Sequence, residues 1–245
     1  MNLNKVALLR NLRAGVVDLA RAANICINAG AHGITLHPRP DQRHARYSDV
    51  YEMAALVAER GNIELNVEGN PLPEFLSVVR RVRPAQCTLV PDAPDALTSD
   101  HGWDLETCAE QLRPIIAELR GLAIRVSLFV DPDPRLIQLA SELGADRIEL
   151  YTEPYARAAS EGNAHDSLVT YAAVAREAGR FALGTNAGHD LNLDNLGAFC
   201  SAVPGVLEVS IGHALITDAL MVGLDAAVRS YVAVLEAVAG NRAPS

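Results

Sequence analysis

The chain has 245 residues, of which 49% are hydrophobic and 21% charged, and its formal net charge is −9. This composition is typical of a globular protein rather than a disordered one, and the negative charge would repel nucleic acid and anionic membrane surfaces, so neither is expected as a partner. No stretch reaches the roughly 18 consecutive apolar residues of a membrane span, and charges interrupt the apolar N-terminus, so we expect a cytoplasmic protein.

Short runs of residues that favour β-strands alternate with amphipathic segments along the whole chain. The eight runs are, in chain order, 2–6, 33–37, 63–68, 86–91, 124–131, 147–152, 181–186 and 207–213. The first of these runs is the weakest. In the segments between the runs, apolar residues recur at spacings of three and four, which is typical of surface helices. Strands that alternate with helices predict a parallel sheet.

The spacing of the runs favours a single closed barrel. Successive runs begin roughly 25 to 35 residues apart, and eight such units fill about 250 residues, the usual length of a (β/α)8 TIM barrel. We therefore predict one α/β barrel over residues 1–240, followed by a frayed tail at 241–245. A doubly wound open sheet is the alternative, but it usually has fewer strands, and no G-x-G-x-x-G sequence follows the first run.

Cysteine and lysine usage gives weaker signals. The four cysteines, Cys26, Cys87, Cys108 and Cys200, are widely separated and include no C-x-x-C pair, so we interpret them as small core residues. Lys5 is the single lysine beside 20 arginines. Either this position needs the compact, titratable ammonium group of a lysine, or Lys5 is a chance remnant in a chain that otherwise uses arginine.

Chemically active side chains lie where the predicted strands end, and catalytic groups of TIM barrels converge on that rim. In chain order the rim is predicted to hold Asn4, Lys5, His37, Glu68, Asp92, Thr98, Asp131, Glu149, Thr152, Asn186, His189, Gly212 and His213. Because histidines and carboxyls exchange protons near neutral pH, we assign His37, Glu68 and His189 to an active site. Glu149 is either a further member or only a buried, hydrogen-bonded carboxyl.

Two phosphate-sized sites are also indicated. Gly212 ends the last run directly before a helix, and Gly188 lies in the turn of the run before it, so a phosphate is expected between these two loops. A basic cluster, formed by Arg10, Arg13, Arg39, Arg43 and His44, follows the first two runs and suits a second phosphate. Ordinary glycine turns and solvated arginines are the alternatives.

A metal site is not expected. His37, Glu68, His189 and His213 could in principle surround a zinc ion, but no H-x-H or HExxH sequence occurs.

Eight collinear motifs give the chain a family resemblance. They are "NLNKVALLRNLR", "GITLHPRPDQRH", "NVEG", "TLVPDAPDALTS", "VSLFVD", "RIELYT", "NAGHDLN" and "SIGHALI", and they span nearly the whole chain. In these motifs the chain resembles the pyridoxine 5′-phosphate synthase family, which performs the ring-closing step of one route to vitamin B6. The resemblance implies a (β/α)8 barrel that assembles as a homo-octamer and uses no metal or organic cofactor.

The implied reaction condenses 1-deoxy-D-xylulose 5-phosphate with 3-amino-2-oxopropyl phosphate to give pyridoxine 5′-phosphate, inorganic phosphate and water. By motif, His37 and Glu68 would be the bases, His189 the acid, and Glu149 would stabilise charge in the transition state. Substrate contacts would come from Asn2, Arg13, Arg39, His44, Thr98, Gly212 and His213.

The chain departs from the common family pattern at three of its candidate substrate contacts. Asn4 and Lys5 stand where many members have Asp and His, and Asp190 stands where Gly is common. Two other functions remain open. The chain could be another phosphosugar aldolase or isomerase barrel, or a non-catalytic paralogue that binds pyridoxine phosphate.

Overall fold

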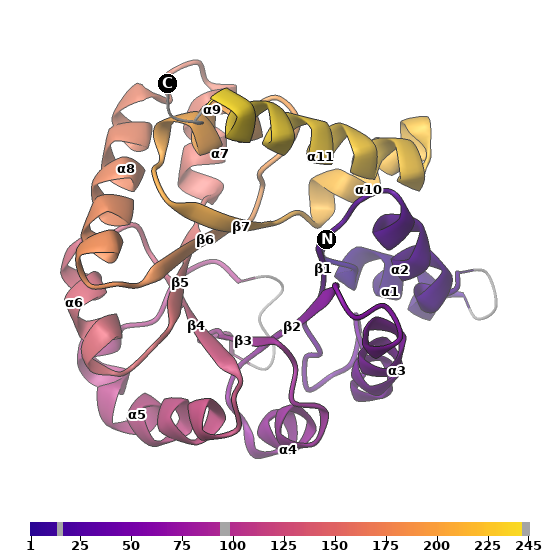
Figure 1. The fold of residues 1–245 in the computed structure, drawn as a ribbon, viewed down its shortest axis with the longest axis horizontal. Coiled ribbons are helices and arrows are strands. Elements are labelled where there is room, and N and C mark those ends of the chain that lie inside the picture. Colours follow the sequence, from indigo (N-terminus) through magenta and orange to yellow (C-terminus); the bar gives the residue numbers. More distant parts are fainter. Residues whose placement is uncertain (14–16, 94–98, 242–245) are drawn as a thin grey trace.

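The computed structural model describes residues 1–13, 17–93 and 99–241, in which strands and helices alternate (Figure 1). The strands are β1 Gly33–Leu36, β2 Glu64–Gly69, β3 Gln86–Leu89, β4 Arg125–Val130, β5 Arg147–Tyr151, β6 Gly184–Gly188 and β7 Val206–Ser210. The helices are α1 Asn4–Leu12, α2 Leu19–Asn28, α3 Tyr47–Ala58, α4 Pro73–Val82, α5 Leu105–Gly121, α6 Arg135–Glu142, α7 Glu153–Ser160, α8 His165–Arg180, α9 Leu196–Ala202, α10 His213–Val222 and α11 Leu224–Asn241. The predicted tail begins at Asn241, the last residue of α11, and its other residues lie outside the described ranges.

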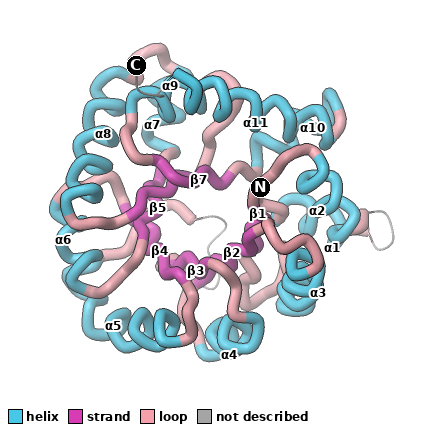
Figure 2. Tube along the Cα trace, in the orientation of Figure 1, coloured by secondary structure: helices cyan, strands magenta, loops and turns pink. Residues whose placement is uncertain are grey.

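The strands form one parallel sheet in the order β1 to β7, and this sheet curls into a nearly closed barrel. Figure 2 shows the strands as an inner ring surrounded by helices. The prediction of a (β/α)8-type barrel is confirmed. Because all pairs are parallel, the C-terminal ends of the strands meet at one rim.

The first predicted strand, residues 2–6, is wrong. Asn2 makes only an isolated parallel bridge with Thr35, and α1 begins at Asn4. The buried side chains here recur at spacings of three and four, which is the pattern of one helical face: Leu3, Val6 and Ala7. This periodicity outweighs the weak β tendency, so Asn4 and Lys5 lie in the first turn of α1 and not at a strand end.

Residues 1–3 bridge the two edge strands of the sheet, β1 and β7, near the C-terminal ends of these strands. The N–H of Asn2 donates to the carbonyl of Ile211, just beyond β7, at 2.9 Å, and the N–H of Leu3 donates to the carbonyl of Thr35 in β1 at 3.1 Å. A groove of about 790 Å³, lined by residues of β1, β7 and α11, separates the rest of these edges. Among the described residues, main-chain contacts therefore close the ring only near the C-terminal ends of the strands.

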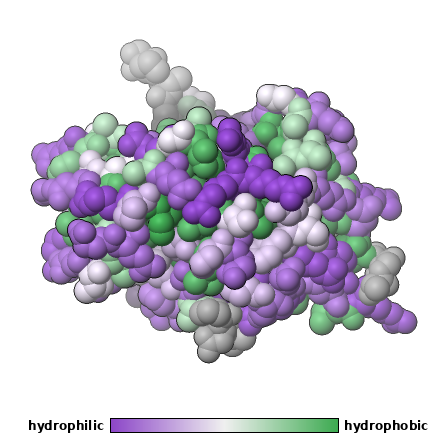
Figure 3. All heavy atoms as spheres, turned by 90° about the horizontal axis from the view of Figure 1, so that it is seen from below, coloured by the Kyte–Doolittle hydropathy of each residue, from purple (hydrophilic) through white to green (hydrophobic). Residues whose placement is uncertain are grey.

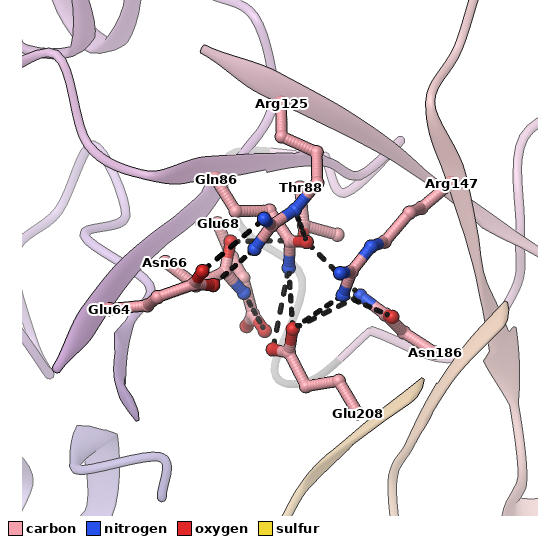
Figure 4. Close-up of polar contacts among 9 residues, drawn as sticks. All are labelled: Glu64, Asn66, Glu68, Gln86, Thr88, Arg125, Arg147, Asn186 and Glu208. Atoms are coloured by element: carbon pink, nitrogen blue, oxygen red, sulfur yellow. Dashed lines mark hydrogen bonds and ion pairs between the residues drawn. The ribbon is translucent and has the colours of Figure 1, made fainter. Parts of the chain in front are cut away.

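The inside of the barrel is filled by polar side chains (Figure 4), whereas TIM barrels usually fill this space with Val, Ile and Leu. Arg147 donates to Asn186 Oδ1 at 3.0 Å and to Glu208 Oε2 at 3.1 Å. Gln86 donates to Glu208 at 3.3 Å and accepts a hydrogen bond from Arg125 Nε at 2.9 Å. This network ties β3, β4, β5, β6 and β7 together below the rim.

The hydrophobic core lies between the outside of the sheet and the helices. Along β2, Leu65 and Val67 are buried in this core, while Asn66 and Glu68 alternate with them and take part in the polar interior contacts. The outer side that Figure 3 shows is mostly hydrophilic, with scattered hydrophobic areas. No described helix is both long and apolar enough to cross a membrane.

Replacing Arg147 by Met is expected to destabilise the fold by about 1–3 kcal/mol, because Glu208 and Asn186 would lose a donor inside the barrel. Urea unfolding measures the loss. Arg135→Met is the matched control, since the Arg135 side chain is 83% exposed and forms a surface ion pair with Asp133. This control should change stability by less than about 1 kcal/mol. Equal losses in the two variants would contradict a structural role for the interior network.

Candidate active site

His37 lies at the C-terminal end of β1, buried between two carboxyls. Its Nδ1 is 3.9 Å from Glu68 Oε2, and its Nε2 is 3.8 Å from Asp92 Oδ2. The backbone N–H of His37 donates to Asn4 Oδ1 at 2.8 Å, which anchors the strand end to α1. Burial, reinforced by the positive charge of Arg39, lowers the pKa of His37 well below its ordinary value. The imidazole is therefore neutral at pH 7.

Glu68 lies near the end of β2, and its carboxyl faces the barrel interior. The side-chain amides of Asn2 and Asn66 lie at 3.4 and 3.5 Å from its two oxygens. Burial, together with the nearby carboxyls of Glu208 and Asp92, raises the pKa of Glu68 to about 8. Glu68 thus holds its proton at neutral pH and can exchange it close to that range.

Glu149, in β5, is a third buried acid. Its Oε2 has no hydrogen-bond partner among the described residues. Burial, reinforced by the charge of Glu68, raises the pKa of Glu149 well above its ordinary value. Gly188 leaves the space that this carboxyl occupies, since a Cβ there would lie 2.6 Å from Glu149 Oε1.

Replacing Gly188 by Ala tests whether Glu149 takes part in catalysis: the added Cβ is expected to displace the Glu149 carboxyl and to lower turnover by about tenfold or more, because small misplacements of catalytic groups are costly. Gly179→Ala in α8 is the matched control, since a Cβ there meets no atom within 4 Å. The control should keep full turnover. Steady-state rates of the two variants test this, and an unchanged rate in Gly188→Ala would contradict it.

His189 follows β6 with a backbone φ of 79°, in the left-handed region that a non-glycine residue rarely adopts. The Thr152 hydroxyl stabilises this turn by donating to the carbonyls of Gly188 and His189. The imidazole packs on the rings of Phe129 and Tyr151, with centroids 4.8 and 5.6 Å away. Its buried Nδ1 has no partner among the described residues, and burial lowers the pKa of His189.

A buried ion pair lies beside His37. Arg39 Nη2 donates to Asp92 Oδ2 at 2.5 Å, and a small cavity is lined by His37, Arg39, Tyr47 and Asp92. His44 is also buried, and burial, with the charge of Lys5, lowers its pKa to about 4. Two arginines and two histidines of the "HPRPDQRH" segment therefore gather near one side of the rim.

The other candidate substrate-binding residues predicted from the sequence lie in different elements and differ in exposure. Gly212 caps the N-terminus of α10, where an added Cβ would lie 3.3 Å from Asn2 Cβ. Arg13, Asp190 and His213 are exposed, and Thr98 lies outside the described residues. His37 lies 3.9 Å from Glu68, and charge interactions also link His37 with His189 and Glu68 with Glu149.

Arg10 of the basic cluster forms an ion pair, and Asn186 lies away from its expected position on the rim. The Arg10 guanidinium donates to the carboxyl of Asp49 at 2.6 and 2.9 Å. β6 extends to Gly188, so Asn186 points into the polar interior and not at the rim. Among residues 1–13, 17–93 and 99–241, no three His, Cys, Asp or Glu side chains group as a metal-ion site.

Sequence reasoning missed the role of several neighbours. The sequence places Asp92 on the rim but indicates no function for it, and it does not single out Phe129 and Tyr151, whose rings pack against His189. The alternation of Glu64, Asn66 and Glu68 in β2 was a readable signal for a polar barrel interior.

The site combines neutral imidazoles with carboxyls that keep their protons near pH 7. Glu68, whose pKa is raised to about 8, can give and take a proton close to neutral pH, which suits general acid and base catalysis. Acids and bases with shifted pKa values lie near one another towards the C-terminal ends of the strands, so a multistep reaction with repeated proton transfers fits the arrangement.

Comparisons with known proteins agree along nearly the whole chain. A family model described as "Pyridoxal phosphate biosynthesis protein PdxJ" matches residues 1–237. The pyridoxine 5′-phosphate synthase of Xanthomonas axonopodis pv. citri (strain 306) is 54% identical over 243 residues, which cover 96% of this chain and 95% of the relative. The pyridoxine 5′-phosphate synthase of Albidiferax ferrireducens (strain ATCC BAA-621 / DSM 15236 / T118) is 51% identical over 238 residues, with coverages of 95% and 94%.

Solved structures of similar shape are more distant in sequence. A tryptophan synthase from M. tuberculosis superposes with a TM-score of 0.63 at 12% identity and covers 96% of this chain and 90% of that chain. The YdjI aldolase from Escherichia coli K12 gives a TM-score of 0.58 at 13% identity, with coverages of 97% and 86%. At such identities the likeness concerns the fold alone.

Proposed function

Since this chain belongs to the PdxJ family of pyridoxal phosphate biosynthesis proteins, we propose that its barrel rim is the active site of a pyridoxine 5′-phosphate synthase. The reaction joins 1-deoxy-D-xylulose 5-phosphate to 3-amino-2-oxopropyl phosphate and releases pyridoxine 5′-phosphate, inorganic phosphate and water. Joining an amine to a ketone, dehydrating the product and closing an aromatic ring require repeated proton transfers.

The observation that carries the proposal is the buried pair of Glu68 and His37, with Oε2 and Nδ1 3.9 Å apart. These two groups act as the bases. His189 acts as the acid, because its lowered pKa makes its protonated form a strong donor once it has taken up a proton from the substrate. Glu149 stays protonated and donates a hydrogen bond to negative charge that develops in the transition state.

The phosphates of the two substrates would bind at two places on the rim. The N-terminus of α10 at Gly212 offers free backbone N–H groups near the turn at Gly188, and Arg39 with His44 offers a second site. The remaining candidate contacts belong to the same proposal: Asn2, Asn4, Lys5, Arg13, Thr98, Asp190 and His213.

Phosphate release tests the function directly. With both substrates present, we expect the protein to release inorganic phosphate and to form a product with the absorbance of pyridoxine 5′-phosphate. Each substrate alone should release none. Conversion of the ketose phosphate alone would indicate an aldolase or isomerase instead, and tight product binding without phosphate release would indicate a non-catalytic paralogue.

Assembly as a homo-octamer, in the cytoplasm, is part of the same proposal. Exposed apolar side chains at the end of α10 support an interface between copies: Leu220 at 77%, Met221 at 83% and Val222 at 60% exposure. Light scattering after gel filtration should give the mass of eight chains, and Met221→Glu should weaken the assembly. A monomer at working concentration would contradict the proposal.

A further inference from the structure

Asp92 lies inside the site, yet none of the roles assigned above uses it. It follows β3, and it is only 5% exposed. Its Oδ2 accepts a hydrogen bond from Arg39 Nη2 at 2.5 Å and one from Ser99 Oγ at 2.6 Å. The same oxygen lies 3.8 Å from His37 Nε2. One carboxylate oxygen thus faces both a candidate phosphate ligand and a candidate base.

The two ring nitrogens of His37 face different carboxyls. Glu68 Oε2 lies on the Nδ1 side and Asp92 Oδ2 on the Nε2 side. The charged and titratable groups around the ring come from four elements: Glu68 in β2, Asp92 after β3, His189 after β6, and Arg39, Arg43 and His44 after β1. A carboxylate that accepts from one nitrogen of an imidazole determines which nitrogen carries the proton and keeps the other free to act as a base.

We propose that Asp92 is a positioning residue that orients His37 for proton transfer and, through the same oxygen, holds Arg39 toward the substrate. Asp92 keeps the proton of neutral His37 on Nε2, so that Nδ1 remains the accepting nitrogen beside Glu68. The distance of 3.8 Å exceeds a hydrogen bond, and such contacts commonly shorten when substrate binds. The inference rests on the proposed function, because it assigns Asp92 to the same site.

Nitrogen NMR of protein labelled with ¹⁵N-histidine tests the tautomer without any activity. The His37 signals are assigned by their loss in His37→Gln. At neutral pH we expect the unaltered protein to show His37 protonated on Nε2, and Asp92→Asn to lose this preference. Asp92→Glu, which keeps the charge, should restore it at least in part. His37 protonated on Nδ1 in the unaltered protein would overturn the proposal even if Asp92→Asn does not fold.

Kinetics supply a second readout. Asp92→Asn is expected to lower kcat by about 10- to 100-fold, as losses of groups that orient a ligating or catalytic histidine do, and also to raise KM through Arg39. Asp100→Asn is the matched control, because Asp100 lies in the same loop but is exposed and pairs with the exposed His101. Equal kcat in the two variants, with unchanged His37 signals, would overturn the role of Asp92. Absence of turnover in the unaltered protein would overturn the proposed function alone.

Discussion

Replacing Glu68 by Gln is expected to lower kcat by about 10²–10⁴-fold, the usual contribution of a positioned acid or base. The amide keeps the shape of the side chain and its place beside His37, but it cannot take up a proton near neutral pH. Phosphate release with both substrates at saturation measures the loss. Glu64→Gln, on the same face of β2, is the matched control and should keep normal turnover, because Glu64 pairs with Arg125 below the rim.

The pH dependence of the unaltered protein should report the same carboxyl. Burial raises the pKa of Glu68 to about 8, and a base must be ionised to accept a proton. We therefore expect kcat/KM to fall as the pH decreases through about 8. Folding keeps this proton on Glu68 at pH values where the unfolded chain has lost it, so Glu68 costs stability as the pH rises from 4.5 to about 8. Glu68→Gln should remove this cost.

Near-normal turnover of purified Glu68→Gln would show that Glu68 is not a base. The same assignment also fails if Glu68→Gln retains activity at high pH with an unchanged pH profile. A loss shared equally by Glu64→Gln would instead indicate that the polar interior as a whole is required.

Replacing His37 by Ala should also lower kcat by about 10²–10⁴-fold. The substitution removes the imidazole that faces both Glu68 and Asp92, and these carboxyls would lose the polar group between them. His165→Ala is the matched control, because His165 is exposed at the start of α8. Both variants should give the circular dichroism spectrum of the folded barrel. Turnover of His37→Ala equal to that of His165→Ala would remove His37 from the mechanism.

Several helices and strands can be predicted from the local spacing of apolar and polar residues. The apolar spacing of three and four in α8 and the alternation in β2 were visible in the sequence, and the structure forms both elements where they were expected. The first predicted strand failed because three buried apolar residues near the N-terminus have helical spacing. The end of β6 was misplaced by two residues, because pairing with β5 and β7 continues the strand to Gly188.

The residues of the candidate site can be predicted from the sequence only in part. His37, Glu68 and His189 end strands or follow them directly, so barrel topology alone predicts that they converge. Asp92 could be placed on the rim from sequence, but its hydrogen bond with Arg39 joins residues 53 positions apart. The local spacing of residues along the sequence does not predict a contact between positions so far apart.

By itself, the order of residues determined the alternation of strands and helices, the parallel sheet and the rim on which the acids and bases gather, because these follow from periodicity over neighbouring positions. Only the tertiary structure decided which polar side chains pair inside the barrel, and that Glu68 and His37 have shifted pKa values. Burial and charge depend on distances between groups far apart in the chain, and those distances exist only once the barrel has formed.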